Sequence, residues 1–501
     1  MEREVKLAAP AGFKLPAMDG VVDGVVAGRP EHLDLEASYY DSAELVLARN
    51  GVTLRYRTGE PGPGWTLKLP ASKSGSMLVR RELEFGGSAD SIPPGARDLV
   101  RVYLRSRRLK RVARLRTHRT AVPLLNGQGE RLAEVVDDIV TVYEGRRHTG
   151  DIHEVEVELA DGTPPDRRLL RATVARLTAA GCLAAPALPK LVRALGDRAV
   201  APAELALVEL GPKPSLAELI ESVIAAPVER MIWHDAGVRL GGDPEDVHQF
   251  RVATRRLRSH LKTFSPLFDP EWVSVLRSEL QWLGTEIGAV RDTDVLRERL
   301  VTSTAGLPDQ DAAGVALLLK RVDEQAEHAR AGALDALRRH RYDTLIQALV
   351  DGAHSPGFTP AGARRARLSA DRHLTALIRR QWRHLERATR TLEDSPSDAA
   401  LHQVRIRAKQ CRYALEAAAP VLGHPATRLA TAVEGLQTVL GDQHDAVVTE
   451  AWLRDAARAA PRCALVAGQL IAERRTENAR LRSRWPRAWR EADKQAPHDW
   501  R

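Results

Sequence analysis

A short stretch in the middle of the chain carries side chains that could bind an anion. Residues 247–261 read VHQFRVATRRLRSHL, with four Arg and no acidic residue. On a helical wheel that advances 100° per residue, three of the Arg and the first His share one edge, beside the apolar face. These residues are His248, Arg251, Arg255 and Arg258. A solvated face usually mixes charges of both signs, so an ordinary solvated face and an anion-binding surface are the alternatives.

A second stretch repeats the pattern. Residues 401–415 read LHQVRIRAKQCRYAL, and the basic positions match those of the first stretch at a constant offset. The counterparts of the first four residues are His402, Arg405, Lys409 and Arg412. Two further segments align Asp292 with Asp445, each of which could cap a helix or orient a neighbouring His or Arg. Segments that recur in order indicate an internal duplication. We call the four matched basic positions of each copy the basic stripe, and its presence in both copies favours the anion-binding surface.

Composition narrows the class of protein. The 501 residues are enough for two or three domains. The net charge is +9 and is not concentrated in a tail, so any anion must be bound by cations that cluster locally. The three Cys form no CxxC pair, which argues against a disulfide framework and a zinc ribbon. Without an apolar signal region or a long apolar run, we expect a cytoplasmic protein outside the membrane. The low content of aromatic residues, 4%, argues against nucleic-acid binding as the function.

The first part of the chain, to about Gly162, reads as short β-rich runs separated by Gly, Pro and Asp, which predicts an antiparallel sheet or barrel. Charged residues recur two apart, so they share a strand face. Examples are Glu2, Glu4 and Lys6; Arg55 and Arg57; Arg80, Glu82 and Glu84; and Glu154, Glu156 and Glu158. A charged lumen cannot stay dry, but it can hold a polyanion with Mg²⁺ or Mn²⁺, because carboxylates suit these ions and Arg and Lys neutralise phosphate.

These strands resemble the CYTH domains, the triphosphate tunnel metalloenzymes. The pieces EREVK, LRYR, WTLKLP, VRRELE, VVDD, HEVEVEL and PKL occur in the order of that family. The resemblance implies an eight-stranded antiparallel β tunnel over residues 1–197. It also implies metal ligands, with Asp137 the weaker candidate: Glu2, Glu4, Asp137, Glu154 and Glu156. The implied triphosphate contacts are Lys6, Arg55, Arg57, Lys68, Arg80, Arg119 and Lys190, with Arg116 as the alternative to Arg119.

After a predicted linker at residues 198–213, long helical periodicity dominates the sequence. The two basic stretches are similar to the signature of the CHAD domain, the conserved-histidine α-helical domain, over residues 214–490. That resemblance implies two four-helix bundles, about residues 214–350 and 368–490, related by a pseudo-twofold axis. Their basic faces would form a groove or pore for inorganic polyphosphate, and the implied contacts are His248, Arg251, Arg255, Arg258, His402, Arg405, Lys409 and Arg412.

The sequence therefore predicts an α+β protein of two domains that acts on phosphate chains. The tunnel would hydrolyse inorganic triphosphate, or a similar short triphosphate, with Mg²⁺ or Mn²⁺ as cofactor, and the helical domain would bind polyphosphate. Alternatives are a polyphosphate-binding protein without turnover and a tunnel enzyme that acts on thiamine triphosphate or ATP. Ser42, where the family usually has Thr, and Thr66, where it often has His, leave the choice of substrate open.

Overall fold

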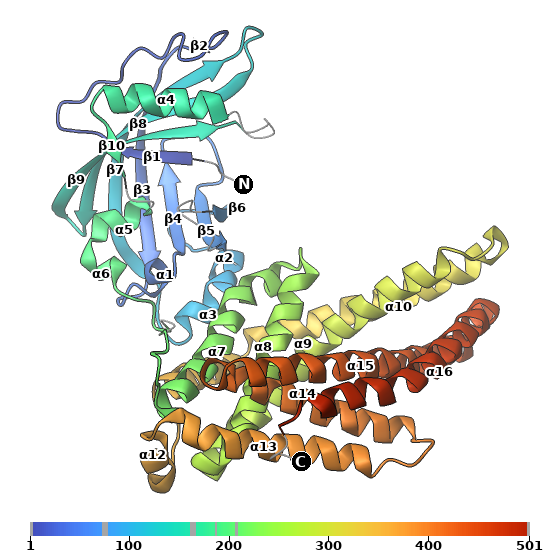
Figure 1. Ribbon diagram of the computed structural model, residues 1–501. Helices are drawn as coiled ribbons and strands as arrows, with labels where there is room; N and C mark the ends of the chain where they lie inside the picture. Colours follow the sequence, from blue (N-terminus) through green and yellow to red (C-terminus); the bar gives the residue numbers. More distant parts are fainter. Residues whose placement is uncertain (1–3, 73–78, 161–166, 186–187, 206–208, 498–501) are drawn as a thin grey trace. The chain divides into compact units, whose positions relative to one another are not determined.

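The computed structural model describes residues 4–72, 79–160, 167–185, 188–205 and 209–497 (Figure 1). The expected ligand Glu2 lies outside these residues, as do the side chains of Glu4 and Arg80. The chain divides into two compact units, Met1–Glu204 and Leu205–Arg501, and the division falls within the predicted linker.

The first unit is built on one antiparallel sheet, in which eight longer strands and two strands of two residues are described. The longer strands are β1 (Glu4–Ala8), β3 (Glu31–Asp41), β4 (Thr53–Thr58), β5 (Trp65–Ser72), β6 (Val79–Phe85), β7 (Lys110–Leu125), β8 (Arg131–Glu144) and β9 (Arg147–Leu159). The short strands are β2 (Val26–Ala27) and β10 (Leu183–Ala184). The order is β10-β1-β9-β8-β7-β3-β4-β5-β6, and β2 pairs with β7. Among these strands, no pair joins the two ends of that order.

Residues 154–157 of strand β9 are buried on both faces of the sheet, and acidic and apolar side chains alternate along them. Val155 and Val157 belong to an apolar core that also contains Leu169 and Leu177 of helix α4 (Arg167–Ala179). The alternate positions, which carry acidic side chains, point to the opposite face of the sheet. Strand alternation therefore places an apolar core on one side of β9 and charged groups on the other.

Helix α5 (Lys190–Leu195) covers part of the charged face. Pro189 precedes its first residue, which suits Pro because no backbone N–H is required there. Leu191, Val192 and Leu195 pack into an apolar cluster with residues of β3, β7 and β8. That packing fixes the start of the helix, and hence Lys190, against the strands. The other helices of this unit are α1 (Val46–Arg49), α2 (Pro94–Leu99), α3 (Arg101–Leu104) and α6 (Asp197–Val200).

The second unit is helical. Its helices are α7 (Leu216–Leu240), α8 (Pro244–Thr263), α9 (Pro270–Thr304), α10 (Ala312–Arg338), α11 (His340–His354), α12 (Pro360–Ala366), α13 (Ala370–Arg390), α14 (Asp398–Leu422), α15 (His424–Ala459) and α16 (Ala464–Gln495). Side-chain caps fix several starts: Ser215 and Glu218 form a capping box at α7, and Ser397 caps α14. No helix in the described part of the chain is both long and apolar enough to cross a membrane.

The duplication is visible in the helix boundaries. Helices α7, α8 and α9 begin at 216, 244 and 270, and α13, α14 and α15 begin at 370, 398 and 424, so each start recurs 154 positions later. Helices α10 and α16 complete the two sets of four. Helix α11 is an addition to the first copy, where it packs on α7 and α9.

Contacts between α8 and α14 are reciprocal. Arg256 donates to Glu416 at 2.9 Å, and Lys262 donates to Gln410 at 3.2 Å. At the 154-residue offset, Gln410 is the counterpart of Arg256 and Glu416 is the counterpart of Lys262. A contact whose two members exchange in this way is what a twofold relation produces, so the two copies pack about a pseudo-twofold axis through these helices.

Candidate functional site

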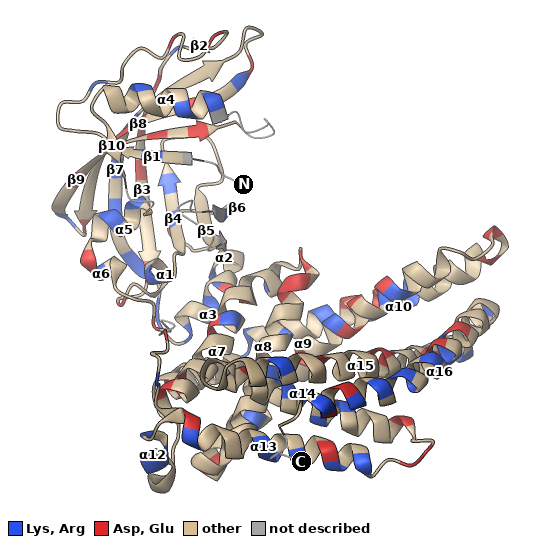
Figure 2. Cartoon of the chain, in the orientation of Figure 1, with Lys and Arg blue, Asp and Glu red and all other residues tan. Residues whose placement is uncertain are grey.

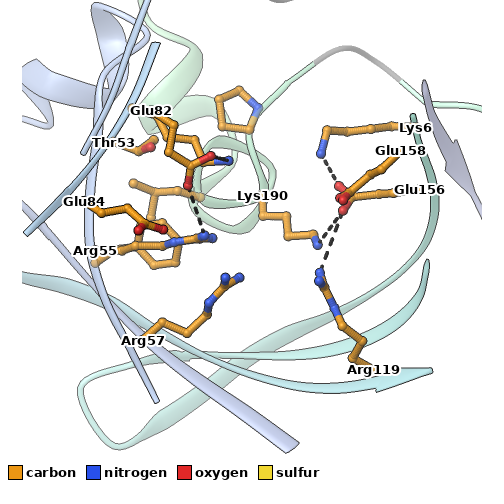
Figure 3. Close-up of a pocket in the computed structure, with 14 residues that line it drawn as sticks. Lys6, Thr53, Arg55, Arg57, Glu82, Glu84, Arg119, Glu156, Glu158 and Lys190 are labelled. Atoms are coloured by element: carbon orange, nitrogen blue, oxygen red, sulfur yellow. Dashed lines mark hydrogen bonds and ion pairs between the residues drawn. The ribbon is translucent and has the colours of Figure 1, made fainter. Parts of the chain in front are cut away.

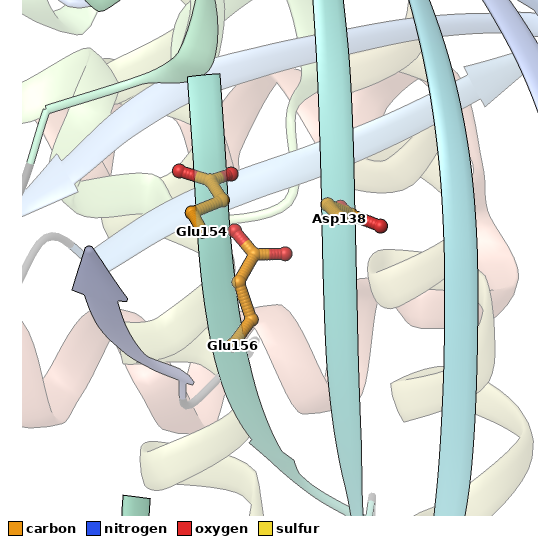
Figure 4. A group of neighbouring side chains, drawn as sticks. All are labelled: Asp138, Glu154 and Glu156. Carbon is orange, nitrogen blue, oxygen red and sulfur yellow. The ribbon is translucent and has the colours of Figure 1, made fainter. Parts of the chain in front are cut away.

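Three carboxylates gather on the charged face of the sheet. Asp138 of β8 is in register with Glu154 of β9, and Glu156 lies two residues further along β9 (Figure 4). One oxygen from each of the three side chains lies within 4.8 Å of the others. The residues are almost fully buried, with 0, 0 and 3% of their surface exposed. Buried carboxylates are costly without cations nearby.

Cations from three elements compensate this acidic cluster. Lys190 donates to Asp138, and its Nζ lies 2.9 Å from Glu154 Oε1 and 3.3 Å from Glu156 Oε2. Arg119 of β7 donates to both carboxylate oxygens of Asp138, each at 2.8 Å. Lys6 of β1 donates to Glu156, its partner in the sheet register. The acidic cluster is therefore surrounded by cations that a phosphate chain could also use.

The crowding of charge shifts the pKa values of this group. Burial lowers the pKa of Lys190 to about 7, with Arg119 and Lys6 acting in the same direction and Asp138 opposing them. Burial acts to raise the pKa of Asp138, but Lys190 and Arg119 outweigh it, so the pKa lies below its ordinary value. Asp138 is thus held ionised, as a metal ligand must be, while Lys190 is poised to lose its proton near neutral pH.

A cavity of about 280 Å³ opens beside the acidic cluster (Figure 3). Arg55 and Arg57 of β4 lie on one side, Glu156 and Arg119 lie on the other, and Lys190 points between them. Lys68 of β5 also lines the cavity, 3.1 Å from Glu82 of β6. The described lining is Lys6, Tyr39, Thr53, Arg55, Arg57, Lys68, Glu82, Glu84, Arg119, Glu156, Glu158, Pro189, Lys190 and Leu191. Such a lining suits a highly charged ligand.

The carboxylates fit a divalent metal ion. Asp138, Glu154 and Glu156 offer three oxygen donors within one ligand sphere, and hard cations such as Mg²⁺ and Mn²⁺ prefer oxygen donors. His and Cys are absent from this cluster, which makes a soft-metal site a poor match. It is the one such group of acidic, His or Cys side chains found among the described residues.

In the helical unit, basic residues occur on most helices (Figure 2), so contacts rather than composition must define a site. Burial, together with the charges of Arg405, Arg255 and Arg251, lowers the pKa of Lys409 of α14 to about 7. Arg251 and Arg255 come from α8, so stripes from both copies lie close together. Arg251 donates to Gly288 O at 2.8 Å and to Asp292 at 2.5 Å, which orients its guanidinium.

The two stripes differ at their ends. Arg412 forms ion pairs with Glu416 at 2.6 Å and Glu434 at 2.9 Å. Its counterpart Arg258 donates to a neutral group, Gln281, at 3.1 Å. The His402 ring lies 4.2 Å from the ring of His444. Arg251, Arg255, Arg405 and Lys409 therefore form the shared centre of the duplicated stripe.

Family models for two domains match the chain, a CYTH domain at residues 1–171 and a CHAD domain at residues 222–454. The uncharacterized protein Rv2226 of Mycobacterium tuberculosis (strain ATCC 25618 / H37Rv) is 32% identical over 466 residues, which cover 89% of this chain and 86% of the relative. The chain is a CYTH–CHAD protein. The CYTH family includes triphosphatases and adenylate cyclases, and the two families are associated with triphosphate, divalent metal and polyphosphate.

Two solved structures are similar to part of this CYTH–CHAD protein. The crystal structure of the CHAD domain from the plant Ricinus communis is 27% identical with a TM-score of 0.47, and covers 58% of this chain and 95% of that one. PptA from Streptomyces chartreusis is 25% identical with a TM-score of 0.47, and covers 56% and 100%.

The structure brings most of the expected tunnel residues of the CYTH–CHAD protein together. Those that line the cavity are Lys6, Arg55, Arg57, Lys68, Arg119, Glu156 and Lys190, and Glu154 joins the acidic cluster. Two expectations need correction. Asp137 points away from the cluster, 2.8 Å from His153. Arg116 lies on the outer face, 2.9 Å from Glu36, so Arg119 is the residue that enters the cavity. Both corrections follow from strand alternation once one face is assigned.

Sequence reasoning missed several residues that the structure places at the site. They are Asp138, Tyr39, Thr53, Glu82, Glu84 and Glu158. For the three Glu the signal was present, because each shares strand parity with an expected site residue. For Asp138 strand parity gave no signal, because Asp137 and Asp138 are consecutive and the sequence alone does not show which of them faces the site. In the helical unit, Asp292 and Asp445 lie inside α9 and α15, so neither caps a helix; each forms an ion pair with an Arg.

Proposed function

We propose that the tunnel of this protein hydrolyses inorganic triphosphate, or a similarly short triphosphate, with a divalent metal ion, and that the helical domain binds inorganic polyphosphate. One observation carries the first part. The cavity is lined on one side by Glu156, a member of the buried acidic cluster, and on the other by the cations Arg55 and Arg57. Membership of the CYTH family, which includes triphosphatases and adenylate cyclases, also supports phosphate-chain chemistry.

The acidic cluster would hold the metal ion. Asp138, Glu154 and Glu156 would hold Mg²⁺ or Mn²⁺, and the bound ion would neutralise phosphate oxygens and polarise the reacting group. Lys190 and Arg119 keep these carboxylates together by contacting more than one oxygen. Their role would be to hold the three carboxylates close together and to offset part of their negative charge.

The opposite wall would bind the substrate. Arg55 and Arg57 are adjacent inward positions of β4, and Arg can bind two phosphate oxygens at once. Lys68 extends this row on β5. Glu82 lies near two of these cations, 3.1 Å from Lys68 and 3.9 Å from Arg55. These ion pairs orient the cations before an anion binds.

The lining favours an inorganic substrate. Ten of the fourteen lining residues are charged, and Tyr39 is the one aromatic residue among them. An organic group as large as thiamine or adenosine would need apolar surface to cover it. The cavity therefore suits the phosphate chain itself better than a bulky group attached to it.

A substrate panel tests the proposal. Phosphate release is measured from inorganic triphosphate, ATP, thiamine triphosphate and long polyphosphate, each with Mg²⁺ and with Mn²⁺. We expect the highest kcat/KM for inorganic triphosphate, and loss of metal-dependent turnover in Glu156→Gln. If triphosphate binds at the cavity but no phosphate is released with either metal, the tunnel is a binding module and the hydrolytic proposal fails.

The duplicated stripe is tested by symmetric variants. Arg251→Ala with Arg255→Ala, and Arg405→Ala with Lys409→Ala, each remove two cations from one copy. Because the four residues form one centre, both double variants should weaken polyphosphate binding comparably without abolishing it. By analogy with nucleic acids, each should reduce the salt dependence of log K by roughly one to two units. Complete loss in one variant and no effect in the other would mean that the copies do not share a site.

A further inference from the structure

A second group of cations lies between α8, α13 and α14, apart from the centre of the duplicated stripe. On α13, Arg380, His384 and Arg387 recur with spacings of four and three, so they share one helix face. Arg407 of α14 and Lys262 at the end of α8 complete the group, and the three helices contact one another. We call these five residues the flank cluster.

Two members of the flank cluster converge on one acceptor. Lys262 Nζ and Arg407 both donate to the Oε1 atom of Gln410, each at 3.2 Å. Arg380 lies close enough to affect both Lys262 and His384 electrostatically. The Nδ1 atom of His384 is buried and has no hydrogen-bond partner. The group thus combines converging donors with a buried ring nitrogen whose hydrogen-bonding capacity is unused.

No member of the flank cluster forms an ion pair with a carboxylate in the described part of the chain. Burial lowers the pKa of His384, and Arg407, Arg380, Lys262 and Arg387 lower it further. Burial also lowers the pKa of Lys262, and the charges that act on it are again cations. A group of like charges held together by the fold is stabilised by a bound anion.

The first copy shows that the duplicated architecture does not require this charge. At the 154-residue offset, Ala226 and Ala253 stand in the places of Arg380 and Arg407, and they line a cavity of about 190 Å³. The ion pair between Arg256 and Glu416 borders the same cavity. At this place the first copy therefore carries fewer cations than the second: Arg230 and Arg256 line the cavity together with Glu416.

The flank cluster is separate from the stripe on α14. Arg405 of the stripe and Arg407 of the flank cluster are two residues apart, so their side chains point about 200° apart around the helix. Asp445 acts electrostatically on Arg405, whereas Arg407 donates to Gln410. One helix thus presents cations on two faces with different surroundings.

We propose that the flank cluster is a second oxyanion site, in which Lys262, Arg380 and Arg407 bind a phosphate group and His384 donates to it. The three cations supply charge-assisted donors from three helices, a geometry that surrounds a tetrahedral anion better than a flat surface does. The phosphate group comes either from free orthophosphate or from the end of a phosphate chain. The site depends neither on hydrolysis in the tunnel nor on binding at the stripe.

Histidine NMR of the full-length protein tests this inference at the site itself. The protein is labelled with ¹³C-histidine, the His384 signal is assigned with His384→Gln, and orthophosphate is added at constant ionic strength with chloride as the reference. We expect a saturable shift of the His384 signal. In Arg380→Gln with Arg407→Gln, the phosphate concentration for half-saturation should rise about tenfold or more, equivalent to about 1.4 kcal/mol.

A matched control removes two Arg from positions of α13 outside the flank cluster. Arg372→Gln with Arg383→Gln should leave the titration unchanged. Arg407→Lys, which keeps the charge, should retain most of the response and guards against a folding defect in the double variant. If polyphosphate shifts the His384 signal and orthophosphate does not, the chain end is the source. No shift with either ligand, or equal shifts in both double variants, would overturn the inference.

Discussion

Asp137 and Asp138 are neighbours in the sequence and lie on opposite faces of β8. Asp138 accepts two hydrogen bonds from Arg119, each at 2.8 Å, within the acidic cluster. Asp137 lies 2.8 Å from Nε2 of His153 on the other face. Burial raises the pKa of Asp137, whereas the cations of the site lower the pKa of Asp138. The pair therefore provides two substitutions of equal chemistry and different consequence.

Asp138→Asn should remove metal-dependent turnover, because the amide is a weaker ligand and because a carboxylate that both Lys190 and Arg119 contact is lost. The loss in kcat/KM should be about 100-fold or more, in line with charged hydrogen bonds worth about 1.5–3 kcal/mol each. Asp137→Asn should stay within a few-fold of the wild type. The measurement is phosphate release from triphosphate over a range of metal concentrations. Comparable losses in both variants would contradict the acidic cluster as the metal site.

Arg119 and Arg116 form a second matched pair, on β7. Arg119 enters the cavity and contacts Asp138, whereas Arg116 pairs with Glu36 on the outer face, where its side chain is 53% exposed. Arg119→Gln should lower kcat/KM for triphosphate by about 10- to 100-fold, because a charged partner of phosphate is lost. Arg116→Gln should change it little, since exposed ion pairs contribute little. Steady-state kinetics decide between them, and a larger effect at Arg116 would reverse the assignment of faces.

Polyphosphate binding should depend on pH through Lys409. Its pKa is lowered to about 7 by burial and by Arg405, Arg255 and Arg251. The free protein therefore loses this proton as the pH rises through about 7, whereas a phosphate chain favours the protonated amine. Binding should take up protons, and affinity should fall as the pH rises from about 7 to 9.

Lys409→Arg should flatten that fall, because a guanidinium stays charged over this range. Isothermal titration calorimetry in buffers of different ionisation enthalpy measures the proton uptake directly. Lys320→Arg, at a lysine whose side chain is 73% exposed, is the control and should behave as the wild type. Undiminished proton uptake near pH 8 in Lys409→Arg would show that another group titrates.

The two units should function separately when the chain is divided after Glu204. A fragment of residues 1–204 should hydrolyse triphosphate, and a fragment of residues 205–501 should bind polyphosphate. Glu204 accepts from Arg107 at 2.9 Å and also pairs with Arg105, so a fragment that ends at 198 should be less stable by about 1 kcal/mol. Urea unfolding of the fragments 1–198 and 1–204 measures the difference in their free energy of unfolding. Equal stability would show that the Glu204 contacts contribute nothing.

Much of the architecture could be predicted from the sequence because it depends on local periodicity. Alternating charges two residues apart define one face of a strand whatever it pairs with, and Glu154 and Glu156 were identified in this way. The recurrence of His248 at His402 with its basic stripe revealed the duplication, and the helix starts follow it. Resemblance to two families supplied the roles that periodicity alone leaves open.

Which of two neighbouring residues faces the site could be decided only from the tertiary structure. A strand taken alone does not reveal whether Asp137 or Asp138 faces the tunnel. Register decides it, because β8 aligns Asp138 with Arg119 on one side and with Glu154 on the other. The flank cluster needed three helices at once, since Arg407 has no basic counterpart in the first copy. Sequence by itself determined which residues share a face, and packing determined what each face meets, because side chains from distant segments become neighbours only when the chain folds.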